Sequence, residues 1–315
     1  MPSTAKPPTT VDEQIRLLRS RGMRVDDHLA RQWLSNVSYY RLSAYWYPAR
    51  APTPKGCRGD TFAKGTDFTH VVDLYEADRK LRTVVHDGME RIETSMRTRV
   101  GEELYNNGPL GYRNPAAFRP EFDHNRWLDT ANKRVARASR HNAAIQHHQK
   151  KYGGNYPFWV LAEVLDLSDI SQLYEGLPLT SQQRIAQSLK VHPDLASLPK
   201  SQRKKAARTP PLVRWMEQIT IVRNTCAHHG RLWNRSFVPA PSSALRTIPG
   251  LQDLPQGQSE RAFGAVVLMA HLLRTISPGT TWPDRVDRLL TESFMPNPLV
   301  QATSLGAPTD WHGGL

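Results

Sequence analysis

The chain has 315 residues, and its 42 Lys and Arg outnumber its 29 Asp and Glu, which leaves a formal net charge of +13. Such a basic balance favours a polyanionic partner such as nucleic acid, although charge alone does not separate nucleic acid from an acidic membrane surface. The two cysteines, Cys57 and Cys226, lie far apart and outside any Cys-x-x-Cys pair. This excludes a disulfide framework and a zinc site of the usual spacing, and it fits a reducing compartment.

Residues 1–10 are polar and contain proline, with no apolar stretch after the lysine. This composition is typical of a disordered leader and not of a secretory signal. The longest apolar run, residues 262–270, is far shorter than the roughly 20 residues that a membrane-spanning helix needs. The sequence therefore predicts a cytoplasmic protein without a membrane partner.

Apolar residues recur at three- and four-residue spacings along most of the chain, which indicates helices. In chain order, the predicted helices cover Val11 to Leu34 with a break at Gly22, then 67–105, 125–151, 157–176, 179–189, 212–222, 259–276 and 284–294. The longest of them is expected to be two helices, or one helix bent at Gly88. Loops are expected over residues 49–65, 106–120 and 193–211. Because no stretch alternates like a strand beyond a few residues, the predicted class is all-α, without a substantial sheet.

The chain changes character after Arg235, where prolines and glycines interrupt residues 239–257. A helical pattern returns afterwards, and the end of the chain is again rich in proline and glycine. Four parts are therefore predicted: a disordered leader (1–10), a helical domain (11–235), a helical C-terminal extension (236–294) and a loose tail (295–315).

The most informative motif is the run from Arg223 to His228, at the end of an apolar helix. An imidazole can move protons near neutral pH, and a guanidinium can stabilise charge that develops on a phosphate. Metal-free RNA cleavage needs these two groups, because the attacking nucleophile is the 2′-hydroxyl of the RNA itself. His228 is thus the candidate base or acid, Arg223 the candidate clamp on the transition state and Asn224 a positioning residue, with no metal and no cofactor.

The spacing of the motif also has a geometric consequence. Five residues advance roughly 140° around a regular helix. Arg223 and His228 therefore do not share a face, whereas Asn224 and His228, four residues apart, do. One such helix makes a poor active site by itself.

Several neighbours of the motif are candidate RNA ligands. His229 could replace His228 as the base, or could tune the site or bind phosphate. The residues Arg231, Trp233, Asn234 and Arg235 could stack on or clamp a base, or could hold the loop after the motif. The role of Trp233 is expected to be structural.

Two more distant arginines, Arg41 and Arg97, are also candidates for RNA binding. Arg97 could instead pair with acids such as Glu90 and Glu93 at helical spacing. The aromatic run over residues 37–47 could stack on single-stranded RNA, but such density more often packs a core, and the core is favoured. The cluster Arg203-Lys204-Lys205 is expected in a solvated loop that would strengthen phosphate binding.

Between residues 11 and 235, several motifs follow one another in a fixed order. They are Gln14-x-x-x-Leu18, the run Ser38 to Trp46, the stretch Phe68 to Arg82, Glu90-Arg91-Ile92-Glu93-x-x-x-Arg97, Trp159-Val160-x-x-Glu163, Leu173-Tyr174, and Arg223-Asn224-x-x-x-His228-x-x-Arg231-x-Trp233-Asn234. Together they resemble the Abi-like proteins of the AbiD/AbiF group. These proteins are similar to the HEPN superfamily, whose helical members are in many cases RNases of abortive infection or of toxin–antitoxin pairs.

The resemblance implies an HEPN-like helical bundle with additional helices, and it maps the family's Arg-x4-His motif onto Arg223 and His228. In that superfamily two motif helices meet across a twofold axis. Since this chain has a single copy of the motif, the resemblance implies a homodimer. One departure, Asp166-Leu167-Ser168-Asp169 in place of a short aromatic–glycine pair, concerns local helix packing and not the motif.

The predicted function is that of a metal-independent endoribonuclease in a bacterial abortive-infection or toxin–antitoxin system. Its partners would be RNA, a second copy of the chain, and an antitoxin RNA or protein. Two alternatives stay open. One is a non-catalytic protein that captures a structured RNA, and the other is a module that binds a protein or a nucleotide.

Overall fold

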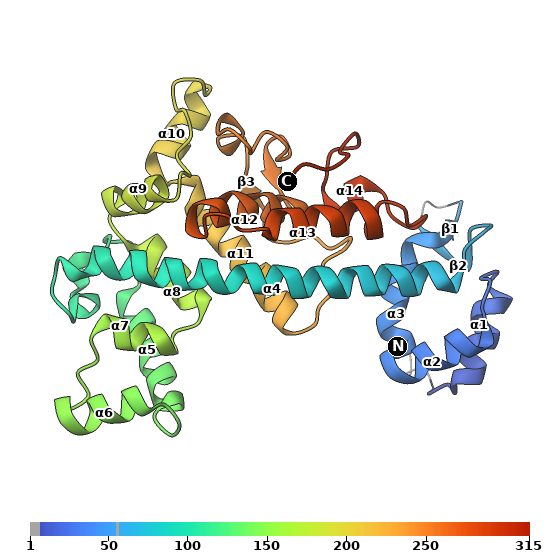
Figure 1. Ribbon diagram of the computed structural model, residues 1–315, viewed down its shortest axis with the longest axis horizontal. Coiled ribbons are helices and arrows are strands. Elements are labelled where there is room, and N and C mark those ends of the chain that lie inside the picture. The colour runs from blue at the N-terminus through green and yellow to red at the C-terminus, as the bar shows by residue number, and fades with distance from the viewer. Residues whose placement is uncertain (1–6, 55–56) are drawn as a thin grey trace. The chain divides into compact units, whose positions relative to one another are not determined.

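The computed structural model describes residues 7–54 and 57–315. Most of these residues form α-helices, accompanied by two antiparallel two-stranded sheets (Figure 1), so the predicted all-α class is confirmed. The chain divides into two compact units. The first comprises Met1–Leu81 and Asp287–Ala302, and the second comprises Arg82–Val286 and Thr303–Leu315. Within the described ranges, no helix combines the length and the apolar character that crossing a membrane requires.

The first unit opens with short helices whose starts are capped by polar side chains. The helices are α1 (Val11–Ser20), α2 (Asp27–Val37), α3 (Tyr39–Trp46) and the first part of α4 (Phe68–Tyr105). Thr10 caps α1 in a reciprocal capping box with Glu13. Asp26 caps α2, because its carboxylate accepts a hydrogen bond of 2.8 Å from the backbone N–H of Leu29. Of the predicted disordered leader, residues 1–6 lie outside the described residues.

The aromatic run is divided between the core and the surface. Tyr45 and Trp46 are buried, and the hydroxyl of Tyr45 donates a hydrogen bond of 2.7 Å to the buried carboxylate of Asp78 on α4. Tyr40 and Tyr47, in contrast, are 89% and 51% exposed. The expectation of a packed core is therefore correct for the first pair and wrong for the second.

The predicted loop over residues 49–65 contains a β-hairpin. A 3-10 turn (Tyr47–Ala49) leads into strand β1 (Arg50–Pro52), which pairs with β2 (Arg58–Phe62), while residues 55–56 lie outside the described residues. In β2 only Phe62 is buried. The hairpin could not be predicted because such short, largely exposed strands carry no alternating pattern.

Helix α4 continues through Gly88 without a break (Figure 1), so the prediction of two separate helices is wrong. The glycine has a packing role. A Cβ atom at this position would lie 2.7 Å from the indole of Trp282, and that indole donates a hydrogen bond of 2.7 Å to the carbonyl of Val84. The missing side chain thus lets the ring of Trp282 approach the backbone of α4.

Ten further helices follow α4 along the chain. They are α5 (His124–Ala138), α6 (Ala143–Tyr152), α7 (Phe158–Leu161), α8 (Leu167–Gly176), α9 (Leu179–Ser188), α10 (Lys200–Arg208), α11 (Pro211–Ala227), α12 (Ala262–Ile276), α13 (Trp282–Leu289) and α14 (Ala302–Leu305). Short 3-10 turns lie between α4 and α5 (Gly111–Arg113 and Pro115–Ala117), after α7 (Ala162–Val164) and between α11 and α12 (Leu245–Thr247), and a π-helical turn follows α13 at Leu290–Phe294. The second sheet pairs β3 (Ala240–Pro241) with β4 (Gln258–Ser259).

Three predicted elements differ from the structure. The helix predicted over residues 125–151 is divided into α5 and α6, because Asn142 caps a new helix by accepting a hydrogen bond from the N–H of Ile145. The helix predicted over residues 157–176 is divided where Asp166 and Asp169 cap α8 in a capping box. The predicted loop over residues 193–211 contains α10, so the Arg203-Lys204-Lys205 cluster is helical. No residue of α10 is buried. Its sequence lacks the apolar stripe by which a helix is recognised, and the helix could therefore not be predicted.

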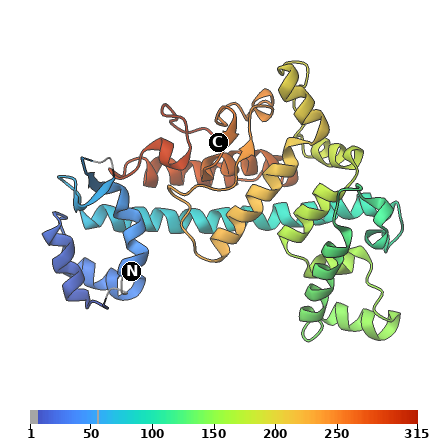
Figure 2. The same cartoon turned by 180° about the vertical axis from the view of Figure 1, so that it is seen from behind.

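Helix α11 forms the centre of the second unit. Figure 2 shows it crossing α4, and its inward side chains, among them Trp215, Met216 and Ile219, are fully buried. The side-chain amide of Gln218 donates hydrogen bonds to the carbonyls of Val238 (2.8 Å) and Ser259 (2.7 Å). These bonds attach the small second sheet to α11, so that the helix is held along its length before it reaches the predicted motif.

Candidate functional site

The predicted motif lies at the C-terminal end of α11. Arg223 and Asn224 belong to the last turn of the helix, and His228 is the residue at which the helix ends, with φ −93° and ψ 18°. The backbone N–H of His228 still donates to the carbonyl of Asn224 at 3.0 Å. The imidazole of His228 therefore leaves the chain at the boundary between helix and loop, and it is exposed.

A Schellman motif terminates α11 directly after His228. The N–H of His229 donates to the carbonyl of Cys226 at 2.9 Å, and the N–H of Gly230 donates to the carbonyl of Thr225 at 2.7 Å. In this motif His229 has φ +56°, a left-handed conformation that glycine ordinarily adopts. The side chain of His229 is thus projected from a backbone conformation that disfavours a side chain, which makes the position a candidate for function.

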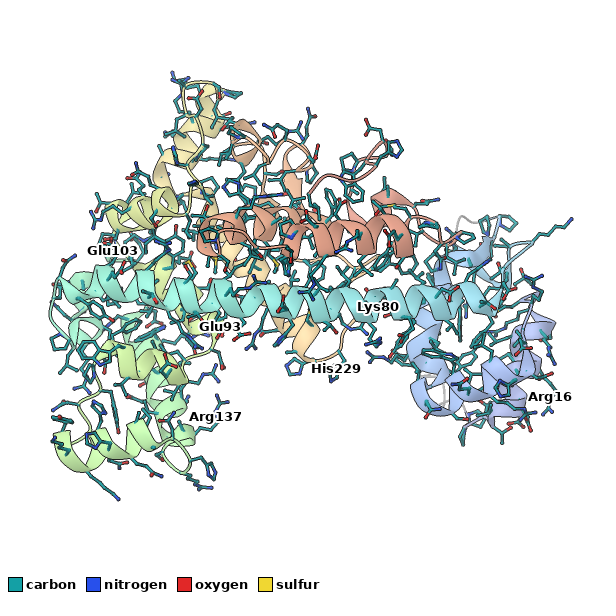
Figure 3. The ribbon with its side chains drawn as sticks, in the orientation of Figure 1. Arg16, Lys80, Glu93, Glu103, Arg137 and His229 are labelled. Carbon is teal, nitrogen blue, oxygen red and sulfur yellow. The ribbon has the colours of Figure 1, made fainter. Side chains whose placement is uncertain are left out.

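The guanidinium of Arg223 faces a carboxylate that a second arginine shares. Its Nη2 lies 3.6 Å from Oε2 of Glu93 on α4, whose Oε1 accepts a hydrogen bond of 2.5 Å from Nη2 of Arg97. Arg97 also donates to the carbonyl of Leu165 at 2.8 Å. We refer to Arg97, Glu93 and Arg223 as the Glu93 cluster. Figure 3 labels Glu93 on α4 and His229 in the turn after α11.

The Glu93 cluster carries two positive charges and one negative charge, and it is only partly accessible. The side chains of Glu93, Arg97 and Arg223 are 11%, 21% and 27% exposed, respectively. Partial burial makes these interactions less sensitive to screening than a surface ion pair. The cluster can therefore orient Arg223 while its excess positive charge remains available to an anion.

The side chain of Asn224 is close to Arg223, whereas the imidazole of His228 is unengaged. Oδ1 of Asn224 accepts a hydrogen bond of 3.3 Å from Nη1 of Arg223. In the part of the chain that the structure describes, neither ring nitrogen of His228 forms a hydrogen bond. An exposed, unengaged imidazole and an oriented guanidinium, both at the end of one helix, are groups that can act on a bound phosphodiester.

The residues that follow the motif hold the loop in place. Trp233 is fully buried, and the guanidinium of Arg231 lies over its ring at 5.8 Å from the centroid. Asn234 donates from its backbone N–H to the carbonyl of Ser304 at 3.0 Å, and its side chain accepts a hydrogen bond of 3.3 Å from Arg261. Arg235 is exposed, with its guanidinium 5.6 Å from the ring centroid of Phe237. Of these candidates, Arg235 is the most accessible to a ligand.

Two candidate arginines outside the motif occupy different surroundings. Arg97 lies in the Glu93 cluster, where the pairing with Glu93 that its helical spacing suggests is confirmed. Arg41 lies in the first unit, half-buried, with its guanidinium 5.8 Å from the ring centroid of Tyr75. The structure therefore brings Arg97 to the motif, and it places Arg41 in the unit that does not contain the motif.

Glu93 is a member of the site that the sequence does not predict. Its spacing to Arg97 indicates an ion pair within one helix, but nothing in the sequence indicates that Arg223, far along the chain, shares the same carboxylate. Among the described residues, no group of three or more His, Cys, Asp and Glu is arranged to hold a metal ion. The side chains gathered here are suited to proton transfer and to binding an anion.

Comparison with known proteins adds a family to this geometry. The family described as Abi-like protein matches residues 32–234, a range that contains the Glu93 cluster and the motif from Arg223 to His228. No curated protein and no solved structure matches the chain. The match covers well over half of the 315 residues and confirms the resemblance noted in the sequence. The chain therefore belongs to the family of Abi-like proteins.

Proposed function

We propose that this Abi-like protein is a metal-independent endoribonuclease that acts in bacterial abortive infection or in a toxin–antitoxin pair. The observation that carries the proposal is the pairing of Arg223 with the shared carboxylate of Glu93, near the end of a helix that terminates at the exposed His228. The net charge of +13 supports a polyanionic substrate.

In the proposed reaction the RNA supplies its own nucleophile. A base takes the proton of a 2′-hydroxyl, the 2′-oxygen bonds to the adjacent phosphorus, and the bond from phosphorus to the 5′-oxygen breaks as that oxygen receives a proton. The products are a 2′,3′-cyclic phosphate and a 5′-hydroxyl, and no water is consumed. His228 acts as the base or the acid, which contributes about 10²–10⁴-fold. Arg223 donates to the phosphoryl oxygens on which charge develops.

The remaining candidates have supporting roles in this proposal. Asn224 and the Glu93 cluster position Arg223. His229 and Arg235, both exposed, bind phosphates next to the scissile linkage. Since the chain contains a single copy of the Arg-x4-His motif, a second copy of the chain completes the site, and the active species is a homodimer.

Cleavage assays with purified protein test the proposal. Arg223→Ala and His228→Ala should each reduce cleavage of single-stranded RNA by about 100-fold or more. Matched controls are Arg137→Ala and His141→Ala, which alter exposed residues outside the motif and should retain full activity. Wild-type cleavage should resist chelators, spare DNA of the same sequence, and leave 2′,3′-cyclic phosphate ends.

The same assays identify the alternatives. Full cleavage by both Arg223→Ala and His228→Ala would reject the proposed site. RNA binding by the wild type without cleavage of any transcript would select the non-catalytic RNA-binding protein. Purification with a protein or a nucleotide, in place of RNA, would select the third interpretation.

A further inference from the structure

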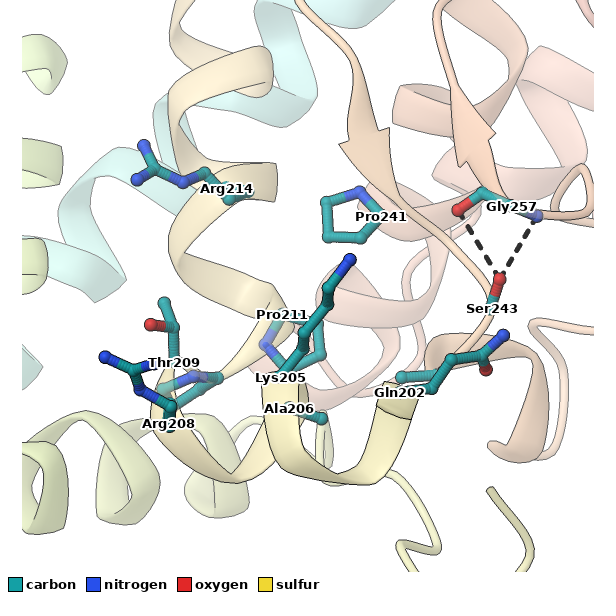
Figure 4. A pocket seen from close by; sticks show the side chains of 12 residues that line it. Gln202, Lys205, Ala206, Arg208, Thr209, Pro211, Arg214, Pro241, Ser243 and Gly257 are labelled. Atoms are coloured by element: carbon teal, nitrogen blue, oxygen red, sulfur yellow. Dashed lines mark hydrogen bonds between the residues drawn. The ribbon is translucent and has the colours of Figure 1, made fainter. Parts of the chain in front are cut away.

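A second candidate site lies at the opposite end of α11. A cavity of about 540 Å³ opens where α10 meets the first turn of α11 (Figure 4). Its third wall comes from the loop that joins β3 to β4, where Oγ of Ser243 accepts a hydrogen bond of 3.1 Å from the N–H of Gly257. The volume is within the range of pockets that hold small ligands, about 300–1,000 Å³.

The base of the cavity is apolar and lined by proline rings. Pro210 and Pro211, at the start of α11, are buried, and Pro241 of β3 faces the same space together with Ala206 and Ala244. Proline rings and alanine methyl groups form flat surfaces without hydrogen-bonding groups. Such a surface can pack against the face of a planar ring, such as that of a nucleobase.

The rim of the cavity is positively charged. Helix α10 carries five cations and no acidic residue: Lys200, Arg203, Lys204, Lys205 and Arg208. Lys205 and Arg208 line the cavity, are exposed, and form no ion pair within the described residues. Arg214, also on the rim, forms ion pairs with Glu175 and Glu217, with nitrogen–oxygen distances of 3.2 and 3.0 Å, respectively. The partial positive charge at the start of α11 acts in the same direction.

We propose that this cavity binds a nucleotide, with its base against the prolines and its phosphate held by Lys205 and Arg208. The nucleotide can belong to an RNA strand or to a free nucleoside phosphate, since the chemistry is the same. Where RNA is the source, the inference rests on the proposed function and deepens it. Pro211 and Arg223 are separated by about 18 Å along α11, so the cavity would select a nucleotide away from the scissile linkage.

Binding assays on the full chain test this inference. His228→Ala serves as the background, so that RNA stays intact, and the probe is a fluorescent single-stranded RNA. Adding Lys205→Glu and Arg208→Glu should weaken RNA binding at least 10-fold and make it less salt-dependent. The matched control, Lys200→Glu with Lys204→Glu, changes the same charge on the same helix outside the cavity and should weaken binding less than 3-fold.

Two further measurements distinguish the effect of the cavity's shape from that of its charge, and identify the source of the bound nucleotide. Ala206→Trp fills the cavity without changing charge and should weaken binding as strongly as the charge reversal, with thermal unfolding confirming that the variant folds. Displacement of the RNA by adenosine monophosphate at micromolar concentration would identify a free nucleoside phosphate as the ligand. Failure of the mononucleotide to compete would identify the strand.

Equal losses in the two charge-reversed proteins, or an unchanged affinity in Ala206→Trp, would overturn the inference and leave only a non-specific basic surface. The outcome is independent of cleavage. If the wild type cuts no RNA, yet nucleotide binding depends on Lys205, Arg208 and Ala206, then the proposed function fails and the nucleotide site stands.

Discussion

The carboxylate of Glu93 lies between two guanidinium groups, and the residue is only 9% exposed. In Glu93→Gln the negative charge between Arg97 and Arg223 is removed and one of the two acceptor oxygens becomes an NH2 group, so the two cations repel each other and one of them loses its acceptor. We expect the free energy of unfolding to fall by about 1–3 kcal/mol. We also expect RNA cleavage to fall, because Arg223 loses its orientation. Urea titration and initial cleavage rates measure the two effects.

The control for this change is Glu90→Gln, which alters an exposed acid one turn away on the same helix. Its effect on unfolding should stay within about 0.5 kcal/mol. If the two variants behave alike in both measurements, the shared carboxylate has no role in positioning Arg223.

His271 is expected to make stability depend on pH. Burial lowers the pKa of His271 below its ordinary value of 6.5, and the charges of Arg274 and Lys190 act in the same direction, against a hydrogen bond to the carbonyl of Lys190. As the pH falls below 6.5, the unfolded chain therefore takes up the proton before the folded chain does. The contribution of His271 to stability is complete above pH 6.5 and declines below it.

Replacing His271 with Gln should flatten this pH dependence. The difference in unfolding free energy between about pH 7.5 and about pH 5.5 should be smaller in His271→Gln than in the wild type, as measured by denaturant titration at each pH. His141→Gln, which alters an exposed histidine between α5 and α6, should leave the difference unchanged. A wild-type slope retained in His271→Gln would contradict the expectation.

For single residues, the sequence predicts the chemistry of a side chain better than it predicts which other side chains lie beside it. The spacing of Arg223 and His228 is sufficient to propose proton transfer and phosphate binding, since both properties belong to the side chains themselves. The position of Glu93 beside Arg223 depends on how α11 crosses α4, which no local pattern encodes. The left-handed conformation of His229 was equally hidden, because the sequence has histidine where glycine would have marked the helix end.

Among the elements, α4 offers the sharpest test, at the contact between Gly88 and Trp282. At an exposed helical position, changing glycine to alanine stabilises by about 1 kcal/mol. Here the new Cβ would meet the indole at 2.7 Å. We therefore expect Gly88→Ala to destabilise the protein by about 1–3 kcal/mol in urea titration, because the ring has to move.

A second variant shows whether the indole is the cause. In a Trp282→Leu background the ring is gone, and Gly88→Ala should cost less or become stabilising. An equal loss in both backgrounds would mean that the glycine is required for another reason, such as the local backbone of α4.

The elements that the sequence predicted are those with one buried face. Helices α11 and α12 bury even more, since most of their residues are buried, and those of α12 include the unbroken apolar run 262–270. Helix α10 has no buried residue and β2 has one, so neither sequence shows a periodic pattern of apolar residues. The division between α5 and α6 depends on a single cap at Asn142, which a pattern that averages over several turns does not resolve.

For the whole molecule, the proposed homodimer predicts complementation between inactive subunits. Arg223→Ala and His228→Ala homodimers should both be inactive. Co-expression should yield mixed dimers in which one subunit supplies the imidazole and the other supplies the guanidinium, with part of the wild-type cleavage restored. Sedimentation equilibrium at micromolar concentration should give the mass of a dimer. A monomer that still cleaves RNA would contradict the shared site.

The all-helical class could be predicted from composition and periodicity, but the division into two units could not. The first unit combines Met1–Leu81 with Asp287–Ala302, and the side-chain amide of Asn297 donates a hydrogen bond of 2.8 Å to the carbonyl of His70. Contacts between such distant segments leave no periodic signal in either one. The two segments are recognisable as one unit only after folding.

The first unit is completed late in synthesis, because its second segment lies near the end of the chain. On the ribosome, the first 81 residues lack the segment that completes their unit until residues 287–302 have been translated. At about 5–20 residues per second, the roughly 200 intervening residues take on the order of 10–40 s. A nascent protein would thus spend most of its translation time with its first unit unfinished.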